Sequence, residues 1–210
     1  MLRPLAGAPQ LSLRPLLLDV GGTLLSPARP VDVTYLELGR PFGVEAVDFR
    51  GAWQRRDPGL QQTGDGRPFW RALVADATNC NDLTYFELLY GFYTRPEAWS
   101  VAPGGRALLG RHDRVALVSN WDSRLPATIE ALGLRVAAIV ASGEQGFEKP
   151  DPRMFLEACR RLGCAPSEAV HVGDSEIEDL QGARAAGIEA WLLGRDVRDL
   201  NELSVRLSVV

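Results

Sequence analysis

The sequence predicts an α/β protein, with a Rossmann-like parallel sheet and an α-helical domain inserted after the first strand. Short apolar runs typical of buried strands alternate with helical segments of about ten residues from residue 100 onward. An aromatic-rich segment with helical patterning separates them from the first apolar run. Such alternation favours a parallel sheet with helices on both faces. We therefore assign residues 12–27 and 100–210 to a core domain, and residues 28–99 to a helical insertion.

The first predicted strand ends in an acidic residue that a glycine-rich turn follows. Residues 14–19 form an apolar run that stops at Asp19, and Gly21 and Gly22 come next. Because glycine carries no side chain, the backbone N–H groups of such a turn can approach an anion closely. The pattern therefore predicts a buried strand that delivers one carboxylate to a polar site.

Four further strands are expected in the second half of the chain, at residues 114–119, 136–141, 169–173 and 188–193. The helices between them carry capping signals. The expected N-caps are Asp122, Asp151 and Ser175. The expected ends are Gly133, Gly163 and Gly187. On the last of these helices, the spacing places three residues on the inner face: Ile177, Leu180 and Ala183.

The inserted segment is rich in aromatic residues and poor in strand patterns. Its amphipathic helices are indicated by Leu73, Ala77, Leu83 and Leu89. From the usual burial of aromatic side chains, we expect most of them to form the core of the insertion. They are Trp53, Phe69, Trp70, Tyr85, Phe86, Tyr90, Phe92, Tyr93 and Trp99.

Composition excludes several classes of protein. The net charge is −4 over 210 residues, which argues against a protein that mainly grips nucleic acid or an anionic membrane. No apolar run is long enough for a transmembrane helix, and residues 1–7 lack the apolar stretch of a secretory signal. The three cysteines form no C-x-x-C pair and are interpreted as free thiols in a reducing cytoplasm. Among the 23 basic residues, Lys149 is the only lysine.

Other titratable residues are interpreted as structural. His112 lies between Arg and Asp and is expected in an exposed turn, and His171 is expected as a strand residue satisfied locally. Cys159 and Cys164 are expected to pack as small apolar side chains or to lie at the surface.

In a parallel α/β sheet, ligands bind beyond the carboxyl ends of the strands, which lie at one rim of the sheet. This rule places Asp19, Ser119, Asp174 and the segment around Lys149 at that rim. Carboxylates and carbonyls suit Mg²⁺, whereas a hydroxyl, a lysine and helix N-termini suit a phosphate. These groups are the components of a phosphoryl-transfer site, in which a carboxylate can also serve as the nucleophile.

Four segments in this order resemble the four motifs of the haloacid dehalogenase superfamily, and the helical insertion resembles that family's C1 cap. Trp70, Trp99 and residues 119–122 further resemble one subgroup of the superfamily. The four motif segments are residues 16–24, 117–120, 149–152 and 171–179.

The resemblance implies a role for each matching residue. Asp19 corresponds to the nucleophile and a Mg²⁺ ligand, the Gly21 carbonyl and Asp174 to further ligands, and Asp179 to a residue that orients the metal site or reaches it through water. The remaining implied contacts are with the phosphate. They involve Gly22, Ser119, Asn120 and Lys149, of which Lys149 also neutralises the charge on the nucleophile.

One position departs from the phosphatase pattern. Phosphatases of this family usually carry an acid two residues after the nucleophile, which protonates the leaving group, and here that residue is Gly21. The favoured interpretation is a Mg²⁺-dependent hydrolase of small phosphorylated metabolites, with a good leaving group or with an acid from the cap, the substrate or water. The alternatives are a non-catalytic protein that binds Mg²⁺, a phosphorylated ligand or a protein partner, and a 2-haloacid dehalogenase.

The alternatives differ in what the sequence retains. Asp174 and Asp179 argue against the dehalogenase, because that chemistry requires no metal site. A phosphonate hydrolase of the family requires a cap lysine, and the cap here contains none. Candidate substrate contacts from the cap, beside its aromatic residues, are Arg55, Arg56, Arg67 and Arg71.

Overall fold

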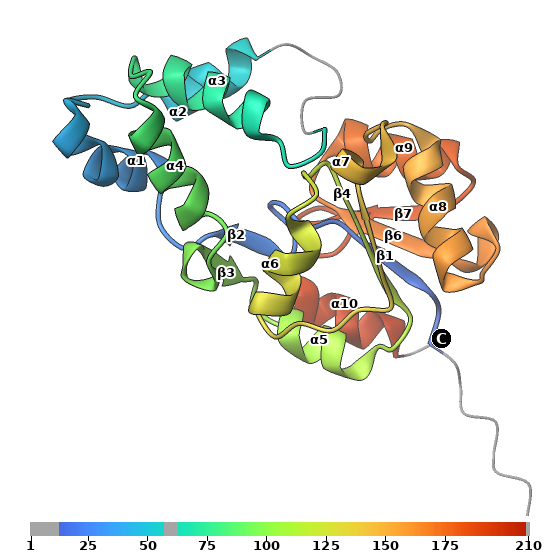
Figure 1. Ribbon diagram of the computed structural model, residues 1–210. Coiled ribbons are helices and arrows are strands. Elements are labelled where there is room, and N and C mark those ends of the chain that lie inside the picture. The colour runs from blue at the N-terminus through green and yellow to red at the C-terminus, as the bar shows by residue number, and fades with distance from the viewer. Residues whose placement is uncertain (1–12, 57–62, 209–210) are drawn as a thin grey trace, which may run out of the picture.

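The computed structural model in Figure 1 describes residues 13–56 and 63–208. Its centre is a five-stranded parallel sheet with the strand order β5-β4-β1-β6-β7. The predicted Rossmann-like α/β fold is confirmed, and each strand lies within the range expected from the sequence. The strands are β1 (Leu16–Leu18), β4 (Val115–Ser119), β5 (Ala138–Ala141), β6 (Val170–Gly173) and β7 (Glu189–Leu192).

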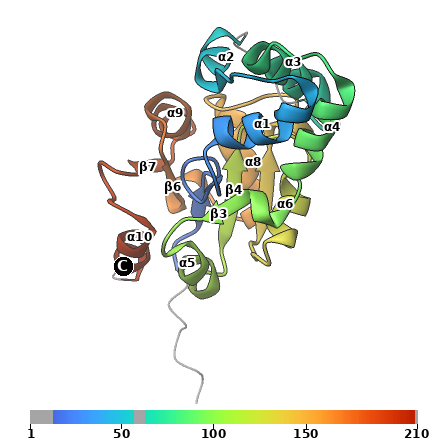
Figure 2. The same ribbon diagram turned by 90° about the vertical axis from the view of Figure 1, so that its left-hand side faces the viewer.

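Side chains of the central strand alternate between two apolar layers, as period-2 geometry requires. Leu16 and Leu18 pack on one face, against α5 (Gly105–Arg111), α6 (Leu125–Ala131) and α10 (Leu200–Leu207). Leu17 packs on the opposite face, where the covering elements are α8 (Pro152–Leu162), the π-helical segment η4 (Glu176–Gln181) and α9 (Gly182–Ala185). Figures 1 and 2 show these two layers of helices around the sheet. The sheet is therefore buried on both faces, which explains its continuous apolar runs.

The helix ends show which capping predictions were correct. Asp151 accepts the Arg153 N–H, Ser175 accepts the Glu178 N–H, and Gly163 ends α8 with φ 62°. Asp122 Oδ1 accepts the Arg124 N–H at 3.0 Å, the bond expected of an N-cap, although α6 itself begins at Leu125. One prediction was wrong. Ile177 is 61% exposed, because the π-helical winding of η4 changes the angular spacing of its side chains.

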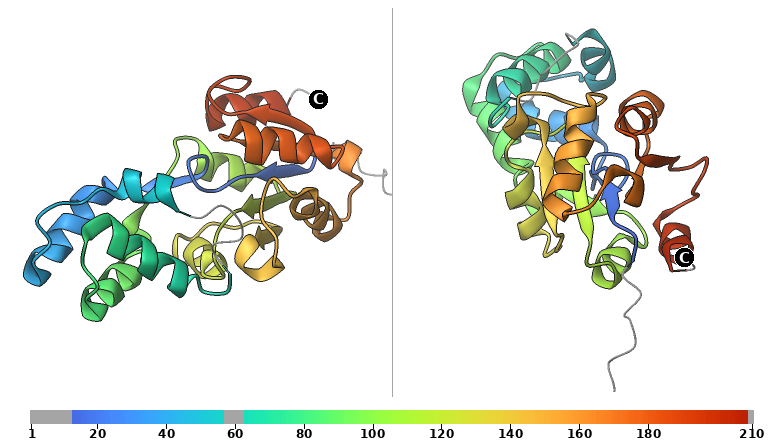
Figure 3. Two further views of the ribbon diagram at one scale, coloured as in Figure 1. Left: turned by 90° about the horizontal axis from the view of Figure 1, so that it is seen from above. Right: turned by 90° about the vertical axis from the view of Figure 1, so that its right-hand side faces the viewer.

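The described part of the inserted segment, residues 28–56 and 63–99, contains four α-helices on the side where β1 ends. They are α1 (Val31–Gly39), α2 (Phe49–Arg55), α3 (Arg67–Thr78) and α4 (Leu83–Phe92). An antiparallel ribbon of β2 (Leu25–Pro27) and β3 (Trp99–Val101) joins them to the core. Figure 3 shows the helices grouped beside the sheet. Leu73, Ala77 and Leu89 are buried as expected, whereas Leu83 is 53% exposed at the start of α4. We call residues 28–99 the cap.

Short helical elements complete the path of the chain. They are the 3₁₀ turns η1 (Arg40–Phe42), η2 (Pro96–Ala98) and η3 (Pro166–Glu168), and the single α-helical turn α7 (Ser142–Gln145). Within the described ranges, no helix has both the length and the apolar character needed to cross a membrane. Residues 1–7, which were interpreted as unlike a secretory signal, lie outside the described residues.

The predicted position of His112 was wrong. It follows α5 directly and is only 3% exposed, while Asp113 beside it is exposed, because the chain passes from α5 straight into the buried strand β4. His171 is a buried strand residue, as predicted, and Cys80, Cys159 and Cys164 are free thiols. Cys159 belongs to the core cluster that α8 forms under the sheet.

Candidate active site

A buried lysine joins two carboxylates at the end of the central strand. Lys149 Nζ lies 2.6 Å from Asp19 Oδ1 and 2.6 Å from Asp179 Oδ1. Burial alone lowers the pKa of Lys149, but the two carboxylates outweigh it, and the net shift is upward. Burial raises the pKa of Asp19, and Lys149 opposes that shift only in part. Lys149 is therefore held as a cation against the carboxylate that follows β1.

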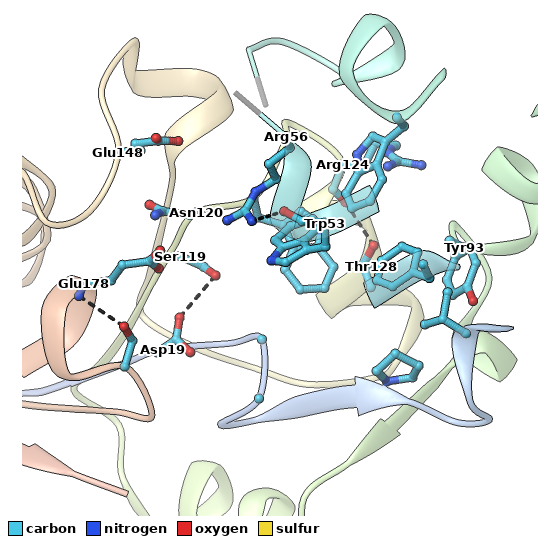
Figure 4. Close-up of a pocket in the computed structure, with 18 of the residues that line it drawn as sticks. Asp19, Trp53, Arg56, Tyr93, Ser119, Asn120, Arg124, Thr128, Glu148 and Glu178 are labelled. Carbon is cyan, nitrogen blue, oxygen red and sulfur yellow. Dashed lines mark hydrogen bonds between the residues drawn. The ribbon is translucent and has the colours of Figure 1, made fainter. Parts of the chain in front are cut away.

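Two neighbouring residues orient this group. Asn120 exchanges two hydrogen bonds with the Lys149 backbone, since its Nδ2 donates to the carbonyl at 2.9 Å and its Oδ1 accepts from the N–H at 2.7 Å. The Ser119 hydroxyl donates to Asp19 Oδ1 at 3.3 Å, and Figure 4 shows this contact. Both residues lie where β4 ends, beside the end of β1. The register of the parallel strands therefore brings residues about one hundred positions apart into contact, as the rim rule predicts.

Asp179 is held from several directions. Its Oδ1 also contacts His171 Nε2 at 2.9 Å, and its Oδ2 accepts the Ser175 N–H at 3.0 Å. Burial raises the pKa of Asp179, but Lys149 and His171 outweigh that effect and leave it lowered. With 1% exposure and these partners, Asp179 is suited to fixing Lys149.

The glycine turn brings Asp174 close to Asp19. Ligand atoms of Asp19, Asp174 and Asp179 all lie within 4.8 Å of one another. Gly22 has φ +79°, and a Cβ at this position would lie 2.3 Å from Asp174 Oδ2. Only glycine therefore permits this approach. The Gly22 N–H already donates to the Leu25 carbonyl at 2.9 Å, so this amide contributes to the turn itself.

The donors at this rim fit a hard cation. Burial raises the pKa of Asp174, and the nearby carboxylates of Asp19 and Asp179 raise it further. A divalent ion would relieve that repulsion, and carboxylate and carbonyl oxygens are the ligands that Mg²⁺ prefers. The carboxylates of Asp19, Asp174 and Asp179 lie close enough together to offer oxygen atoms to one ion.

Gly21 lies beside this set in a more open setting. A Cβ built there would meet only Trp121 Cζ3, at 3.8 Å, which is an ordinary van der Waals distance. Both residues line the cavity above Asp19. A Cβ at position 21 would therefore fit without displacing its neighbours.

A cavity of about 780 Å³ connects this rim to the cap. Its core end is lined by all the predicted site residues, namely Asp19, Gly21, Gly22, Ser119, Asn120, Lys149, Asp174 and Asp179. Its cap end is lined by aromatic and aliphatic side chains, among which Figure 4 labels Trp53 and Tyr93. The volume is within the range typical of small-molecule sites, about 300–1,000 Å³.

The expectation for the cap aromatics was only partly correct. They pack on one another, as Trp53 does on Trp70 and Tyr93 on Trp99. Six of the nine also line the cavity: Trp53, Trp70, Phe86, Tyr90, Tyr93 and Trp99. The distinction depends on which side of each helix faces the core domain, and periodicity cannot show this.

Of the four cap arginines proposed as substrate contacts, Arg56 lines the cavity. Its guanidinium lies over the Trp53 ring, 3.9 Å from the centroid. Arg55 pairs with Asp48 and Asp76, while Arg67 pairs with Asp65 and Glu87, in both cases at exposed positions. Arg71 lies in a separate depression between α3 and α4.

Sequence reasoning missed several lining residues. Trp121 and Arg124 follow Ser119 within five residues, and Glu178 directly precedes Asp179. Proximity to the motifs was the available signal for these three. Thr128 lies one helical turn after Arg124 on α6, and it was missed because the inner face of α6 was assigned to the core alone.

The parallel sheet, with its polar residues gathered where the strands end, places the chain among Rossmann-like α/β proteins that carry their site at this edge. Residues 15–187 match the family described as haloacid dehalogenase-like hydrolase. The chain belongs to this family of hydrolases.

Relatives agree with this assignment. Haloacid dehalogenase-like hydrolase domain-containing protein 3 of Mus musculus is 33% identical, covering 89% of this chain and 84% of that protein. It represents the subgroup that Trp70, Trp99 and residues 119–122 resemble. A phosphoserine phosphatase of Thermus thermophilus is 34% identical over 53% of this chain and 48% of that protein.

Solved structures show the same fold. An L-2-haloacid dehalogenase superimposes with a TM-score of 0.74 at 21% identity, covering 94% of this chain and 100% of that one. A HAD phosphatase from Thermococcus onnurineus gives a TM-score of 0.66 at 24% identity, covering 93% and 98% of the two chains.

Proposed function

We propose that this protein is a Mg²⁺-dependent hydrolase of small phosphorylated metabolites that acts through an aspartyl-phosphate on Asp19. The observation that carries the proposal is the contact between Asp19 and the buried Lys149 at the base of the cavity. A carboxylate is a useful nucleophile toward a phosphate dianion only where nearby positive charge offsets the repulsion between them. Lys149 supplies that charge, and the phosphatase relatives favour this chemistry.

The reaction has two displacements. The Asp19 carboxylate attacks phosphorus, the phosphorus–oxygen ester bond breaks, and the leaving oxygen departs with its electron pair and takes a proton from water. A water molecule then attacks the phosphorus of the aspartyl-phosphate. The bond to Asp19 breaks, phosphate is released and the carboxylate is restored. Ser119 and Lys149 orient Asp19 for the attack, and Lys149 remains a cation throughout.

Asp19, the Gly21 carbonyl and Asp174 would hold Mg²⁺, with Asp179 orienting the site through Lys149. When bound, the ion supplies neutralisation of charge on the phosphoryl group. Ser119, Asn120 and Lys149 would contact the phosphate. The turn at Gly22 would support the site through its backbone and its close approach to Asp174. The division into a core domain (12–27 and 100–210) and a cap (28–99) belongs to the proposal.

The proposed partner is a small phosphorylated molecule, with neither nucleic acid nor membrane as a ligand. The mild negative charge and the absence of disulfides among the described cysteines support this assignment and a cytoplasmic location. A protein partner is relevant only to the non-catalytic alternative, which Gly21 keeps open because this residue cannot protonate a leaving group.

The test is phosphate release from a panel of phosphate esters and acetyl phosphate, with Mg²⁺ or with EDTA. We expect turnover that requires Mg²⁺ and is lost in Asp19→Asn. Asp199→Asn is the matched control, because Asp199 caps α10 away from the cavity and asparagine is an equally good cap. Ligand binding with no turnover would favour the non-catalytic protein. Activity on 2-chloropropionate in EDTA would favour the dehalogenase.

A further inference from the structure

The cap end of the cavity is lined mainly by aromatic and aliphatic side chains, and this lining restricts which group the substrate can carry besides its phosphate. Resting on the proposed hydrolase function, we propose that the substrate is a phosphate monoester of a flat, uncharged aromatic alcohol. The phosphoryl group would lie at Asp19 and the aromatic group between the rings of the cap.

Ring faces and aliphatic side chains dominate the cap wall. Trp53 stacks on Trp70 with centroids 6.3 Å apart and planes 27° apart, and Trp99 packs on Trp121 of the core at 4.9 Å. Beside these rings, the wall is completed by Val31, Tyr35, Phe49, Val74, Phe86, Leu89, Tyr90 and Tyr93. Aromatic groups gain most from such a wall, since offset and edge contacts between rings are favourable beyond their burial.

Three polar ring atoms of this wall donate their hydrogen bonds to the protein. Trp70 Nε1 donates to Asp122 at 2.8 Å, Tyr90 Oη to the Asp65 carbonyl at 2.6 Å, and Trp99 Nε1 to the Tyr93 carbonyl at 3.1 Å. A sugar or another polyhydroxylated group would lose hydrogen bonds to water on entering this space. The Tyr93 hydroxyl is buried without a hydrogen-bond partner among the described residues and leaves room for one polar substituent.

The arginines on the wall lie over aromatic rings. Arg124 pairs with the buried Asp122 at 2.7 Å and lies 3.8 Å from the Tyr90 centroid. Arg56 lies 3.9 Å from the Trp53 centroid. Guanidinium planes stack on aromatic faces, so both side chains can extend their stacks onto an aromatic group of the substrate.

Gly21 points to the same class of substrate independently. Without an acid at position 21, a leaving group must depart with little help from proton transfer. A phenol has a pKa of about 10, as the tyrosine side chain does, whereas bulk water, which an aliphatic alcohol resembles, has about 15.7. When the bond to phosphorus breaks, an aryl oxygen carries the electron pair more readily and then takes its proton from water. The cavity wall and the vacant acid position therefore select the same substrates.

The test compares kcat/KM for 1-naphthyl phosphate, phenyl phosphate, acetyl phosphate and glycerol 2-phosphate in Mg²⁺. We expect both aryl esters to exceed glycerol 2-phosphate by at least about tenfold, with the naphthyl ester first. In Trp53→Leu, the ratio of naphthyl to acetyl phosphate should fall by about three- to tenfold, the size of a lost ring contact. Phe42→Leu is the matched control, because Phe42 packs on Tyr85 in the cap and does not line the cavity.

The test distinguishes failure of the proposed substrate class from failure of the proposed hydrolase function. Turnover that depends on Asp19 but shows no preference for aryl esters would overturn the substrate class and leave the hydrolase intact. No turnover of any ester would contradict the hydrolase. Calorimetric binding of phenylphosphonate and methylphosphonate then decides the substrate class, because neither compound can be hydrolysed here. About tenfold tighter binding of phenylphosphonate, reduced in Trp53→Leu, supports an aromatic ligand, and equal affinities overturn it.

Discussion

Replacing Gly21 by aspartate tests whether this site lacks only an acid. The ideal Cβ at position 21 meets only Trp121 Cζ3 at 3.8 Å, and the residue is not in the left-handed backbone region. The substitution should therefore fold, and a glycine replaced without strain commonly stabilises a protein by about 0.4–1 kcal/mol. The new carboxyl would share the cavity with Asp19 and Asp174, whose negative charges raise its pKa and favour the protonated form.

The expected gain depends on the leaving group. General acid catalysis is typically worth about 10²–10⁴-fold, so kcat for glycerol 2-phosphate should rise by about that factor in Gly21→Asp. The gain on phenyl phosphate should be smaller, because a phenol leaves with less need of a proton. The ratio of aryl to alkyl turnover is therefore expected to fall in this variant, and steady-state phosphate release in Mg²⁺ measures it.

Two further variants separate the proton from its side effects. Gly21→Asn has the shape of the aspartate but no acidic proton, so it should show no gain. Gly22→Ala should lose activity, because φ +79° costs an alanine about 1–2 kcal/mol and its Cβ would lie 2.3 Å from Asp174 Oδ2. A folded Gly21→Asp protein that retains its Mg²⁺ dependence but gains nothing on the alkyl ester would refute the reasoning. Equal gains in the aspartate and asparagine variants would refute it too.

Three other expectations concern stability and reactivity. Trp70→Phe removes the donor to the fully buried Asp122 and should cost about 2 kcal/mol in urea unfolding, whereas Trp191→Phe, whose partner Glu189 is exposed, should cost less than about 1 kcal/mol. Equal losses of unfolding free energy in the two variants would show that the Trp70–Asp122 hydrogen bond between cap and core contributes no more than an exposed one. Burial lowers the pKa of His112, so the native state disfavours its protonation and the unfolding free energy should fall as pH drops below about 6.5. In His112→Gln this fall of the unfolding free energy should be missing. The same pH profile in the variant and the wild type would show that His112 does not cause the fall. Burial raises the pKa of Cys159 to about 12, so iodoacetamide at pH 8 should modify Cys80 and Cys164 first, as peptide mass spectrometry can follow. Equally fast labelling of Cys159 in the native protein would show that α8 opens readily.

Local signals in the core were sufficient to predict its elements. The apolar runs that became β1 and β4 are buried on both faces, so their composition alone identifies them. Asp151 followed by Pro152, with Gly163 at the other end, marked α8 because capping is a short-range interaction. Asp122 also accepts a hydrogen bond from Trp70 of the cap, and this contact could not be predicted because no local pattern records it.

The acidic site was predicted as a set of residues, but not as a set of contacts. The motifs brought Asp19, Lys149 and Asp179 to one rim, yet the sharing of Lys149 between two carboxylates depends on side-chain directions. The cavity was less predictable still. Its wall depends on how the cap helices rotate against the core, and this decides that Trp53 lines the cavity while Tyr85 lies in the interior of the cap.

The two neighbouring glycines look alike in the sequence but have different structural reasons to be glycine. In the sequence, Gly21 and Gly22 are both residues of a turn after an aspartate. In the structure, Gly22 is required by its positive φ and by Asp174, whereas Gly21 occupies ordinary backbone with room for a Cβ. Steric need therefore explains a glycine at position 22 but not at position 21. A vacant acid position beside an intact pair of Asp19 and Lys149 is consistent with a site that relies on the leaving group itself, and this links Gly21 to the aromatic wall opposite.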